Sequence, residues 1–465
     1  MADNARTAYR NMRVIEKNMC TVLTPERETK RRVGMFPRQR GLFVAMVMTA
    51  LVPALSGCWD PARDLKTGTV GYVKGFAGGI VADEPRAVLV GRDVLTAGGS
   101  AVDAAVAAGF SLAVTLPSSA GIGGGGICVV HDRAQGTTEV LDFLPGQSSA
   151  AVPALPRGLF ALHARYGRMR WEEILGPAEQ LARFGEPVSR ALAVDLGTHG
   201  AGLVHDSAAR QVFARGTGEP VRAGDHLTQM DLAAFIGRLR RNPADLYGGV
   251  LGREFVAASR HAGASLTLEH MRSWKPRWVT PETIVNGHDT LYTPPMSGAG
   301  GSIHDAWIKR AVAPVAGLNG GGTGFVVVDP SGSAVACALT MRKPFGTGRM
   351  VPGFGSFLTP ASGGDTPLAV ALAINDHVNE FRSGIAAAGA GAAGNAVAVL
   401  SSALGKGGDD VLPKSVMALS SSASGPALVS ALHCDRGLPP WPGSCRVAAD
   451  SRGAGYGLLI GRRSE

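Results

Sequence analysis

The sequence predicts an α+β fold in which two β-sheets lie together with helices on their outer faces. Three observations carry this prediction: helical and hairpin patterns alternate along the chain, no linker long enough to divide two independent domains interrupts them, and no repeat of fixed period occurs. With 465 residues, an apolar fraction of 45% and a charged fraction of 18%, the chain has the composition of a globular protein with a large core.

The first helices are expected at 84–96 and 100–114. Ser100 begins the second helix with Asp103 three residues later, an approximate capping box. The interior of this helix is almost wholly Ala, Val, Gly, Phe and Leu, which predicts burial on most sides. Pro117 ends it.

A glycine-rich stretch, 118–126, leads into an expected hairpin with strands at 127–131 and 137–143. The order is loop then strand, whereas a phosphate-binding loop runs from strand to helix, so we reject a nucleotide site here. Later in the chain, helical patterns occupy 158–166, 171–184, 232–240 and 245–262, and a short strand is expected at 288–292.

The stretch 317–350 organises the rest of the chain. A glycine-rich lead-in is followed by two apolar strands, 325–329 and 333–340, joined by a Pro-Ser-Gly turn. Thr323 lies where the first strand begins. A hydroxyl residue in that place suggests an N-terminal nucleophile, made by cutting the chain before it so that the new amine serves as base. The alternative is an ordinary glycine-rich entry to a hairpin.

The first 57 residues are expected to be a leader. Arg38 and Arg40 precede an apolar run, 41–55, which is too short for a comfortable membrane span and fits a signal-peptide core. The run ends in Leu-Ser-Gly-Cys58, which resembles the lipobox of bacterial lipoproteins, whose cysteine is lipidated. Met35 is the expected true start, and an uncleaved anchor helix is the alternative. Trp59 after the cysteine favours a lipid-anchored protein that faces the periplasm from the outer membrane.

The formal charge of +9 does not indicate nucleic-acid binding. Residues 1–57 hold ten Lys or Arg and four Asp or Glu, a surplus of 6, which leaves +3 for the remainder (9 minus 6). No basic stripe with interleaved aromatic residues occurs in the body. The scattered histidines and cysteines show no metal-ligand spacing, so no metal or cofactor is expected.

The cysteines agree with export. Cys434 and Cys445 flank a short Gly/Pro loop that a disulfide can close in an oxidising periplasm. Cys128 and Cys337 lie inside apolar strands, and we interpret them as buried small apolar residues.

Several motifs in order resemble the gamma-glutamyltransferase (glutathione hydrolase) family. They run from about Gly75 to about Ala393, nearly the whole body, and comprise Ala-Gly-Gly-Ser-Ala-Val-Asp-Ala-Ala-Val-Ala-Ala at 97–108, Pro-Ser-Ser-Ala-Gly-Ile-Gly-Gly-Gly-Gly at 117–126, Leu-Asp-Phe at 141–143, Tyr-Gly-Arg at 166–168, Leu-Ala-Arg at 181–183, Pro-Pro-Met-Ser-Gly at 294–298, Val-Val-Asp-Pro-Ser-Gly at 327–332 and Phe-Gly-Thr-Gly at 345–348.

The resemblance implies a four-layer αββα sandwich of the N-terminal nucleophile hydrolase type, cut into a large chain (58–322) and a small chain (323–465). It further implies a threonine that attacks a γ-glutamyl amide, backbone N–H groups that hold the oxyanion, and transfer of the acyl group to water or an amino acid. The expected partners are a small γ-glutamyl compound or related amide and, after processing, the two chains of one precursor.

The sequence departs from the family pattern at the nucleophile. The family usually has two adjacent threonines before the strand, of which the first is the nucleophile. Counting back from Asp329 places Gly322 at the first position and Thr323 at the second. Either the cut lies between Gly322 and Thr323, or the nucleophile is lost.

The residues that hold the substrate also depart. Leu144 stands where the family has an arginine that clamps the α-carboxylate. Thr340 matches a Thr-x-Asn motif, but Arg342 replaces the asparagine. Arg342 restores a positive clamp or is a solvated hairpin end, and we favour the solvated end.

The family's acidic cluster is reduced to Asp365, and its oxyanion glycine pair is matched by Gly389 and Ala390. Two hypotheses therefore stay open: a lipid-anchored, self-processing γ-glutamyltransferase-like enzyme with Thr323 as nucleophile, or an unprocessed, inactive envelope lipoprotein that keeps the fold for binding.

Overall fold

The computed structural model describes residues 75–145, 152–295, 302–309, 320–361, 366–406, 408, 410–422 and 426–461. The leader, including Cys58 and the expected start at Met35, lies outside these residues. No helix in the described ranges is long and apolar enough to cross a membrane.

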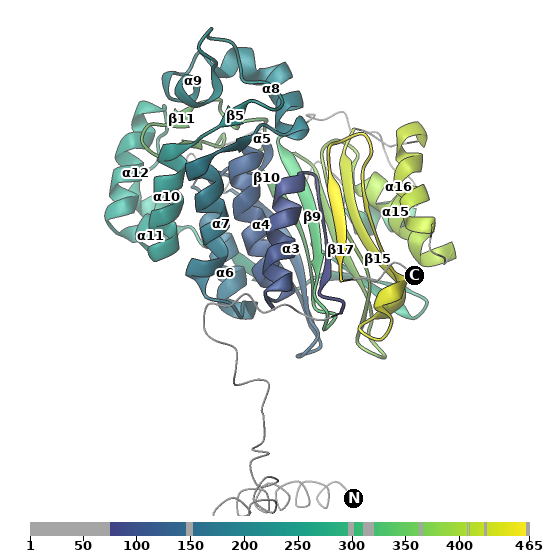
Figure 1. Cartoon of the computed structure of the whole chain (residues 1–465). Helices are drawn as coiled ribbons and strands as arrows, with labels where there is room; N and C mark the ends of the chain where they lie inside the picture. The colour runs from purple at the N-terminus through teal and green to yellow at the C-terminus, as the bar shows by residue number, and fades with distance from the viewer. Residues whose placement is uncertain are drawn as a thin grey trace, which may run out of the picture. The chain divides into compact units, whose positions relative to one another are not determined.

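Within the described part, strands form two large antiparallel sheets (Figure 1). The first has seven strands in the order β17 (Tyr456–Ile460), β1 (Gly78–Ala82), β9 (Gly322–Val328), β10 (Ala334–Thr340), β2 (Gly125–Asp132), β3 (Thr137–Phe143) and β6 (Arg277–Val279). The second has six strands in the order β16 (Cys445–Ala449), β15 (Leu428–Leu438), β14 (Glu380–Ala388), β13 (Leu368–Asn375), β8 (Asp289–Thr293) and β7 (Glu282–Asn286).

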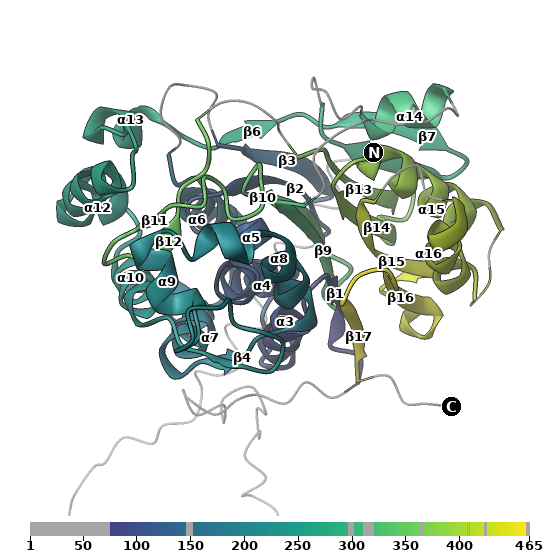
Figure 2. The same cartoon turned by 90° about the horizontal axis from the view of Figure 1, so that it is seen from above.

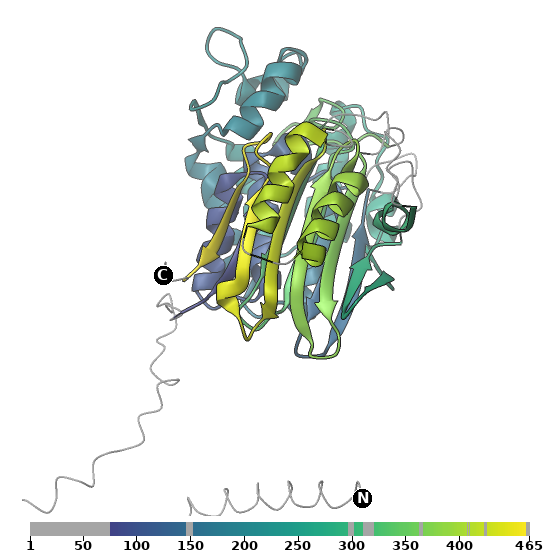
Figure 3. The same ribbon diagram turned by 90° about the vertical axis from the view of Figure 1, so that its right-hand side faces the viewer.

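Helices cover the outer faces of both sheets, as Figure 2 shows from above. The first sheet is covered by α3 (Pro85–Thr96), α4 (Ala101–Thr115) and α6 (Leu155–Tyr166), and α7 (Trp171–Phe184) and α10 (Met230–Arg241) pack outside α4. The second sheet is covered by α14 (Ile303–Lys309), α15 (Ala392–Lys406) and α16 (Val411–Ser422). Figure 3 shows α15 and α16 lying along the second sheet. The predicted αββα arrangement is confirmed.

The remaining elements connect these layers. They are α5 (Pro117–Ala120), β4 (Glu186–Pro187), α8 (Arg190–Leu203), α9 (Ser207–Phe213), β5 (His226–Leu227), α11 (Asp245–Gly248), α12 (Val250–His261), α13 (Leu268–Ser273), β11 (Met350–Val351), β12 (Ser356–Phe357) and the 3₁₀ turn η2 (Pro442–Ser444). The helical region expected over 245–262 is present as two helices, because the chain leaves the helical conformation at Gly249 between α11 and α12.

Side chains that alternate between the two faces of each strand divide the core into layers. In β9, Phe325 and Val327 join the cluster under the helices of the first sheet, whereas Val326 and Val328 join the cluster between the two sheets. Successive side chains of a strand point to opposite faces, so this period of two places every residue of β9 on one layer or the other.

The expected buried helix is α4, which is buried at all fifteen positions. Its capping box is present: the Ser100 hydroxyl accepts from the Asp103 N–H at 3.2 Å, and the Asp103 carboxylate accepts from the Ser100 N–H at 2.9 Å. This helix packs against β9 and β10 and so fixes the back of the hairpin that carries the candidate site.

Two disulfides cross neighbouring strands. The expected Cys434–Cys445 bond is present between β15 and β16. Cys128 and Cys337 are buried as expected, but the interpretation as unpaired cysteines is wrong: they face one another across β2 and β10 with their Cα atoms 4.1 Å apart and form a disulfide. Their separation of 209 residues hides this adjacency from a sequence reading.

Candidate active site

The chain enters β9 through two left-handed glycines. Gly320 has φ 89° and Gly321 has φ 76°, a region that side chains other than glycine rarely adopt. A Cβ at Gly321 would lie 2.5 Å from the carbonyl carbon of Lys343, so the backbone comes too close for any other residue. The glycine-rich lead-in is therefore a tight turn against the loop after β10.

Gly322 and Thr323 face opposite sides of the first sheet. A Cβ at Gly322 would lie 3.0 Å from the Ala388 Cβ, and one at Gly324 would lie 2.8 Å from the Ala386 Cβ, so both glycines face the second sheet. Thr323 lies between them and shares the face of Phe325, toward the helices. The position that corresponds to the family nucleophile therefore faces the space between the sheets and carries no side chain.

The Thr323 hydroxyl donates to a buried carboxylate. Its Oγ1 lies 2.8 Å from Oδ2 of Asp83, which also accepts from the Gly324 N–H at 3.0 Å. The other oxygen, Oδ1, accepts from the Ser430 hydroxyl at 3.1 Å. Because Asp83 follows β1 of the first sheet and Ser430 lies on β15 of the second, this carboxylate joins the two sheets directly beside Thr323.

Burial raises the pKa of Asp83 above its ordinary value. The donors from Gly324, Thr323 and Ser430 oppose this shift, and the nearby charge of Asp450 adds to it. A carboxylate with a raised pKa accepts a proton more readily, so Asp83 has the placement and the basicity of a partner for the hydroxyl. Our sequence reasoning missed Asp83; the available signal was an acid directly after the apolar strand that precedes α3.

A second polar contact polarises the carbonyl of Gly321. Its oxygen accepts from Oγ1 of Thr340 at 2.9 Å and from the N–H of Met341 at 2.8 Å. Two donors on one carbonyl are suited to stabilise negative charge on that oxygen. This carbonyl belongs to the peptide bond before Gly322. The peptide bond before Thr323 has the carbonyl of Gly322 instead, so the polarised carbonyl lies one residue ahead of the carbonyl that Thr323 would attack.

The predicted oxyanion pair lies next to Gly322. Gly389 directly follows Ala388, whose methyl group lies beside the Gly322 position. The Gly389 N–H donates to the Pro367 carbonyl at 2.8 Å, and the Ala390 carbonyl accepts from the Ala427 N–H at 3.1 Å. The Gly389 donor is engaged by the protein itself, and the role of the pair in holding an oxyanion stays a prediction.

Arg342 is buried, so the expectation of a solvated hairpin end is wrong. The residue is only 3% exposed. The guanidinium donates to three backbone carbonyls, those of Pro145 at 2.7 Å, Pro360 at 3.1 Å and Ala361 at 3.0 Å. It thereby ties the segment after β3 to the segment after β12, because a charged group taken out of water needs such partners.

The other predicted residues have plain placements. Thr340 is buried and uses its hydroxyl within the hairpin, since it also accepts from the Arg342 N–H at 2.8 Å. Leu144 packs against the apolar cluster between the sheets. Asp365 lies outside the described residues.

A cavity of about 210 Å³ opens at the other end of the hairpin. It is lined by Ser100, Arg165, Arg168, Asp329 and their neighbours. None of the predicted site residues that the structure describes lines this cavity. In the described ranges, no group of three or more His, Cys, Asp or Glu side chains is arranged to hold a metal ion.

The sequence and the fold match known proteins over different extents. The gamma-glutamyltranspeptidase family model matches residues 87–145 and 143–309. The chain is 31% identical to glutathione hydrolase 3 of Arabidopsis thaliana over 51% of this chain and 41% of the relative, and 29% identical to the glutathione hydrolase proenzyme of Escherichia coli over 54% and 50%. The chain thus spans half the length, or less, of these curated relatives.

The fold extends further than the sequence match. A crystal structure of cephalosporin acylase from Bacillus halodurans superimposes with a TM-score of 0.64 over 86% of this chain and 99% of that one, at 17% identity. This likeness shows the fold alone. The family match ends at residue 309, so β9, Thr323 and the second sheet beyond β8 lie outside it, a narrower extent than the motifs predicted. Residues 87–309, just under half of the chain, match the gamma-glutamyltranspeptidase family model, and over them the chain resembles that family as a divergent relative.

Proposed function

We propose that this chain is an acyl-transfer enzyme that hydrolyses or transfers a γ-glutamyl or related amide, with Thr323 as its nucleophile. The observation that carries the proposal is the 2.8 Å hydrogen bond from the Thr323 hydroxyl to the buried carboxylate of Asp83. A nucleophile in contact with a base that other groups hold in place is the arrangement that covalent catalysis requires. The relatives in Arabidopsis thaliana and Escherichia coli are named as hydrolases of glutathione, a γ-glutamyl compound.

The same pair would process the precursor. Asp83 takes the proton of the Thr323 hydroxyl, and the oxygen attacks the carbonyl carbon of Gly322. The C–N bond between Gly322 and Thr323 breaks, the amide nitrogen gains the proton, and water then hydrolyses the resulting ester. The products are a chain that ends at Gly322 and a chain that begins with the free amine of Thr323.

Cleavage would also give a substrate access to the Thr323 hydroxyl. Thr323 is only 1% exposed and is paired in a continuous strand with Leu339 of β10. A cut before Thr323 releases the strand from the glycine turn that leads into it, so a substrate can approach the hydroxyl only after processing. The name of the Escherichia coli relative, a proenzyme, is in keeping with this order of events.

The acyl group is expected to differ from that of glutathione. Leu144 gives an apolar contact where the family pattern has an arginine, and the guanidinium of Arg342 binds protein carbonyls. Loss of a charge-assisted pair to a carboxylate costs about 1.5–3 kcal/mol. We therefore propose an amide whose acyl part depends less on an α-carboxylate.

A second candidate function is favoured by one specific observation. The carbonyl that receives two donors is that of Gly321, and the residue after it, Gly322, has no hydroxyl to attack it. An unprocessed protein that keeps the fold for binding has this arrangement. In both cases we propose an envelope protein anchored through Cys58 and facing the periplasm.

The experiment that tests the first proposal compares purified wild-type protein with Thr323→Ala by denaturing electrophoresis and by turnover of a γ-glutamyl anilide. The enzyme hypothesis predicts two chains and turnover for the wild type, and one chain without turnover for the variant. Identical behaviour of the two proteins would support the binding protein instead.

A further inference from the structure

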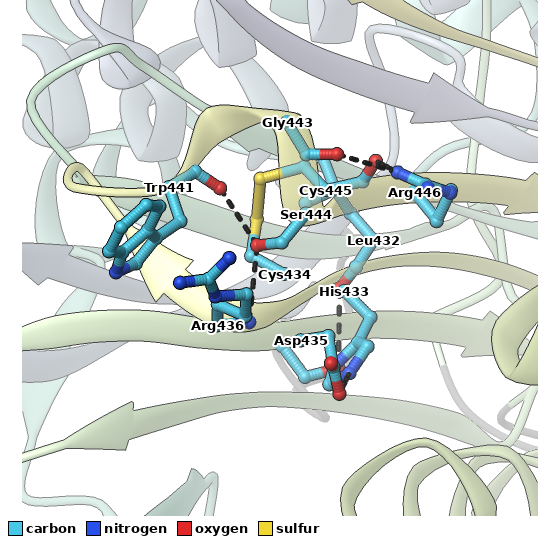
Figure 4. The surroundings of a disulfide bond; sticks show 11 residues. Leu432, His433, Cys434, Asp435, Arg436, Trp441, Gly443, Ser444, Cys445 and Arg446 are labelled. Atoms are coloured by element: carbon cyan, nitrogen blue, oxygen red, sulfur yellow. Dashed lines mark hydrogen bonds and ion pairs between the residues drawn. A yellow bond between two sulfur atoms is a disulfide. The ribbon is translucent and has the colours of Figure 1, made fainter. Parts of the chain in front are cut away.

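The loop between β15 and β16 carries an exposed tryptophan on a rigid base. Trp441 is 48% exposed, and it lies in a Pro-Pro-Trp-Pro sequence, 439–442, that the Cys434–Cys445 disulfide closes (Figure 4). A tryptophan combines an apolar ring with a polar N–H, and such side chains are enriched at boundaries where one end is apolar and the other is wet.

Hydrogen bonds inside the loop fix the backbone around this tryptophan. Figure 4 shows the Ser444 hydroxyl donating to the Trp441 carbonyl at 2.7 Å and accepting from the Arg436 N–H at 3.1 Å. The Ser444 N–H also donates to the Trp441 carbonyl at 3.0 Å. A loop that is already ordered loses little conformational entropy when its tip is buried.

One arginine stacks on the indole, and a second lies on the far side of the disulfide. The guanidinium carbon of Arg436 lies 3.7 Å from the centre of the Trp441 ring, and Arg446 donates to the carbonyls of Gly443 and Cys445 at 2.8 Å (Figure 4). An indole with an apolar body and an N–H, on a loop that carries two arginines, matches the boundary between phospholipid headgroups and acyl chains.

The chain from the leader joins the body at this same end. Gly78, at the start of β1, lies against the Val328 carbonyl and Asp329, where the β9–β10 turn begins. A Cβ at Gly332 in that turn would lie 2.8 Å from the carbonyl of Leu438, the last residue before the tryptophan loop. Three segments far apart in sequence thus meet at one end of the sandwich.

A neighbouring turn adds a second apolar tip. Val378, between β13 and β14, is 52% exposed. Its strand β14 pairs with β15 through Phe381 and Leu438, which brings this turn beside the tryptophan loop. Exposed apolar side chains therefore gather where the tether enters.

From these observations we propose that Trp441 and its loop insert into the interface of the phospholipid bilayer that holds the lipid anchor, and so orient the body on the membrane. The inference relies on the predicted lipidation of Cys58 for the tether. Gly75 follows Cys58 by 17 positions (75 minus 58), and a fully extended chain of that length spans at most about 60 Å. The tether thus attaches at the end that bears the tryptophan loop and limits its distance from the bilayer to this reach.

The test uses the native protein, extracted from membranes and reconstituted in vesicles of phosphatidylcholine and phosphatidylglycerol. The fluorescence of the native protein minus that of Trp441→Phe isolates the emission of Trp441. We expect vesicles made with acyl-chain-brominated lipids to quench most of this difference. Trp307→Phe, which alters a partly buried tryptophan on α14, is the matched control, and its difference is expected to stay unquenched.

An unquenched Trp441 difference in brominated vesicles would overturn the inference. Mass spectrometry of the same sample reports whether Cys58 is lipidated, so failure of the anchor is distinguished from failure of the loop to insert. As a second measurement, amide hydrogen exchange of 437–444 is expected to slow on vesicles, while exchange in α8 stays unchanged. Equal exchange of the loop with and without vesicles would count against insertion.

Discussion

The two ends of the β9–β10 hairpin each rest on a buried aspartate: Asp329 accepts mainly from backbone N–H groups and from the Ser331 hydroxyl, whereas Asp83 accepts mainly from hydroxyls of two different sheets. At the turn, Asp329 accepts from the N–H of Ser331 at 2.9 Å, of Ser333 at 3.2 Å and of Ala101 at 3.2 Å. At the entrance, Asp83 accepts from the hydroxyls of Thr323 and Ser430 and from one N–H.

This difference suggests that Asp329 serves the fold and that Asp83 serves the proposed reaction. Backbone N–H groups at a turn must find acceptors, so Asp329 satisfies a requirement of the fold and links the hairpin to α4. A threonine at the start of a strand needs no buried carboxylate to fold. The turn end carries the Val-Val-Asp-Pro-Ser-Gly motif on which the predicted resemblance rests, whereas the entrance end departs from the predicted pattern at Gly322 and Arg342.

The largest expected effect comes from removing the hydroxyl at the entrance. Thr323→Ala should abolish self-cleavage and amide turnover, a loss on the order of a thousandfold or more, because no other group replaces a nucleophile. Thr323→Ser should retain both activities. Mass spectrometry and anilide turnover measure them.

The control for this variant is Ser430→Ala, which removes another donor to Asp83 without changing β9. It should lower the free energy of unfolding by about 1 kcal/mol while the protein still cleaves. Loss of cleavage in Ser430→Ala to the same extent as in Thr323→Ala would mean that the contact is purely structural.

The next effect tests the one-residue offset between the polarised Gly321 carbonyl and the hydroxyl of Thr323. Gly322→Thr places a hydroxyl directly after the Gly321 carbonyl, which already accepts from Thr340 and Met341. A new cut directly after Gly321, before the introduced hydroxyl, is the expected result, detected by N-terminal sequencing. A Cβ there approaches Ala388 and Thr366 at 3.0 Å, so Gly322→Ala is the control for crowding. Identical products from both variants would contradict the register argument.

At the turn end, Asp329→Ala should destabilise the fold and leave the chemistry alone. Loss of this carboxylate leaves several buried N–H groups without an acceptor, which lowers the free energy of unfolding by about 2–4 kcal/mol. Urea denaturation measures this cost, and cleavage per folded molecule should equal that of the wild type. A stable Asp329→Ala protein would show that the turn does not depend on this aspartate.

The smallest effect is a pH dependence from Asp83. Burial raises the pKa of its folded form above the ordinary value of 3.8, so the folded protein holds the proton more tightly than the unfolded chain. This contribution to stability is complete below about pH 4 and is lost as the pH rises through the folded pKa.

Asp83→Asn removes this titration. The free energy of unfolding of the variant minus that of the wild type should therefore grow as the pH rises above 4, by about 1.4 kcal/mol for each unit of the shift. Urea unfolding at several pH values measures the difference. A difference that stays constant with pH would refute the assignment.

Much of the fold follows from sequence patterns. The capping box at Ser100, the strand at 137–143 and the helix at 171–184 are local features, and the structure has them where they were expected. The family motifs supplied the layer order, which local patterns leave open.

What the sequence could not predict depends on contacts between distant segments. The Cys128–Cys337 bond and the contact of Asp83 with Thr323 join residues more than 200 positions apart. The burial of Arg342 follows from carbonyls of Pro145 and Pro360, and no local pattern indicates it.

The most direct test of the central claim is the intact mass and N-terminal sequence of the purified native protein after prolonged incubation. The account predicts two chains, of which the smaller begins with Thr323. A single uncut chain that contains the Gly322–Thr323 peptide bond would contradict it and leave the protein as an unprocessed relative of the gamma-glutamyltranspeptidases.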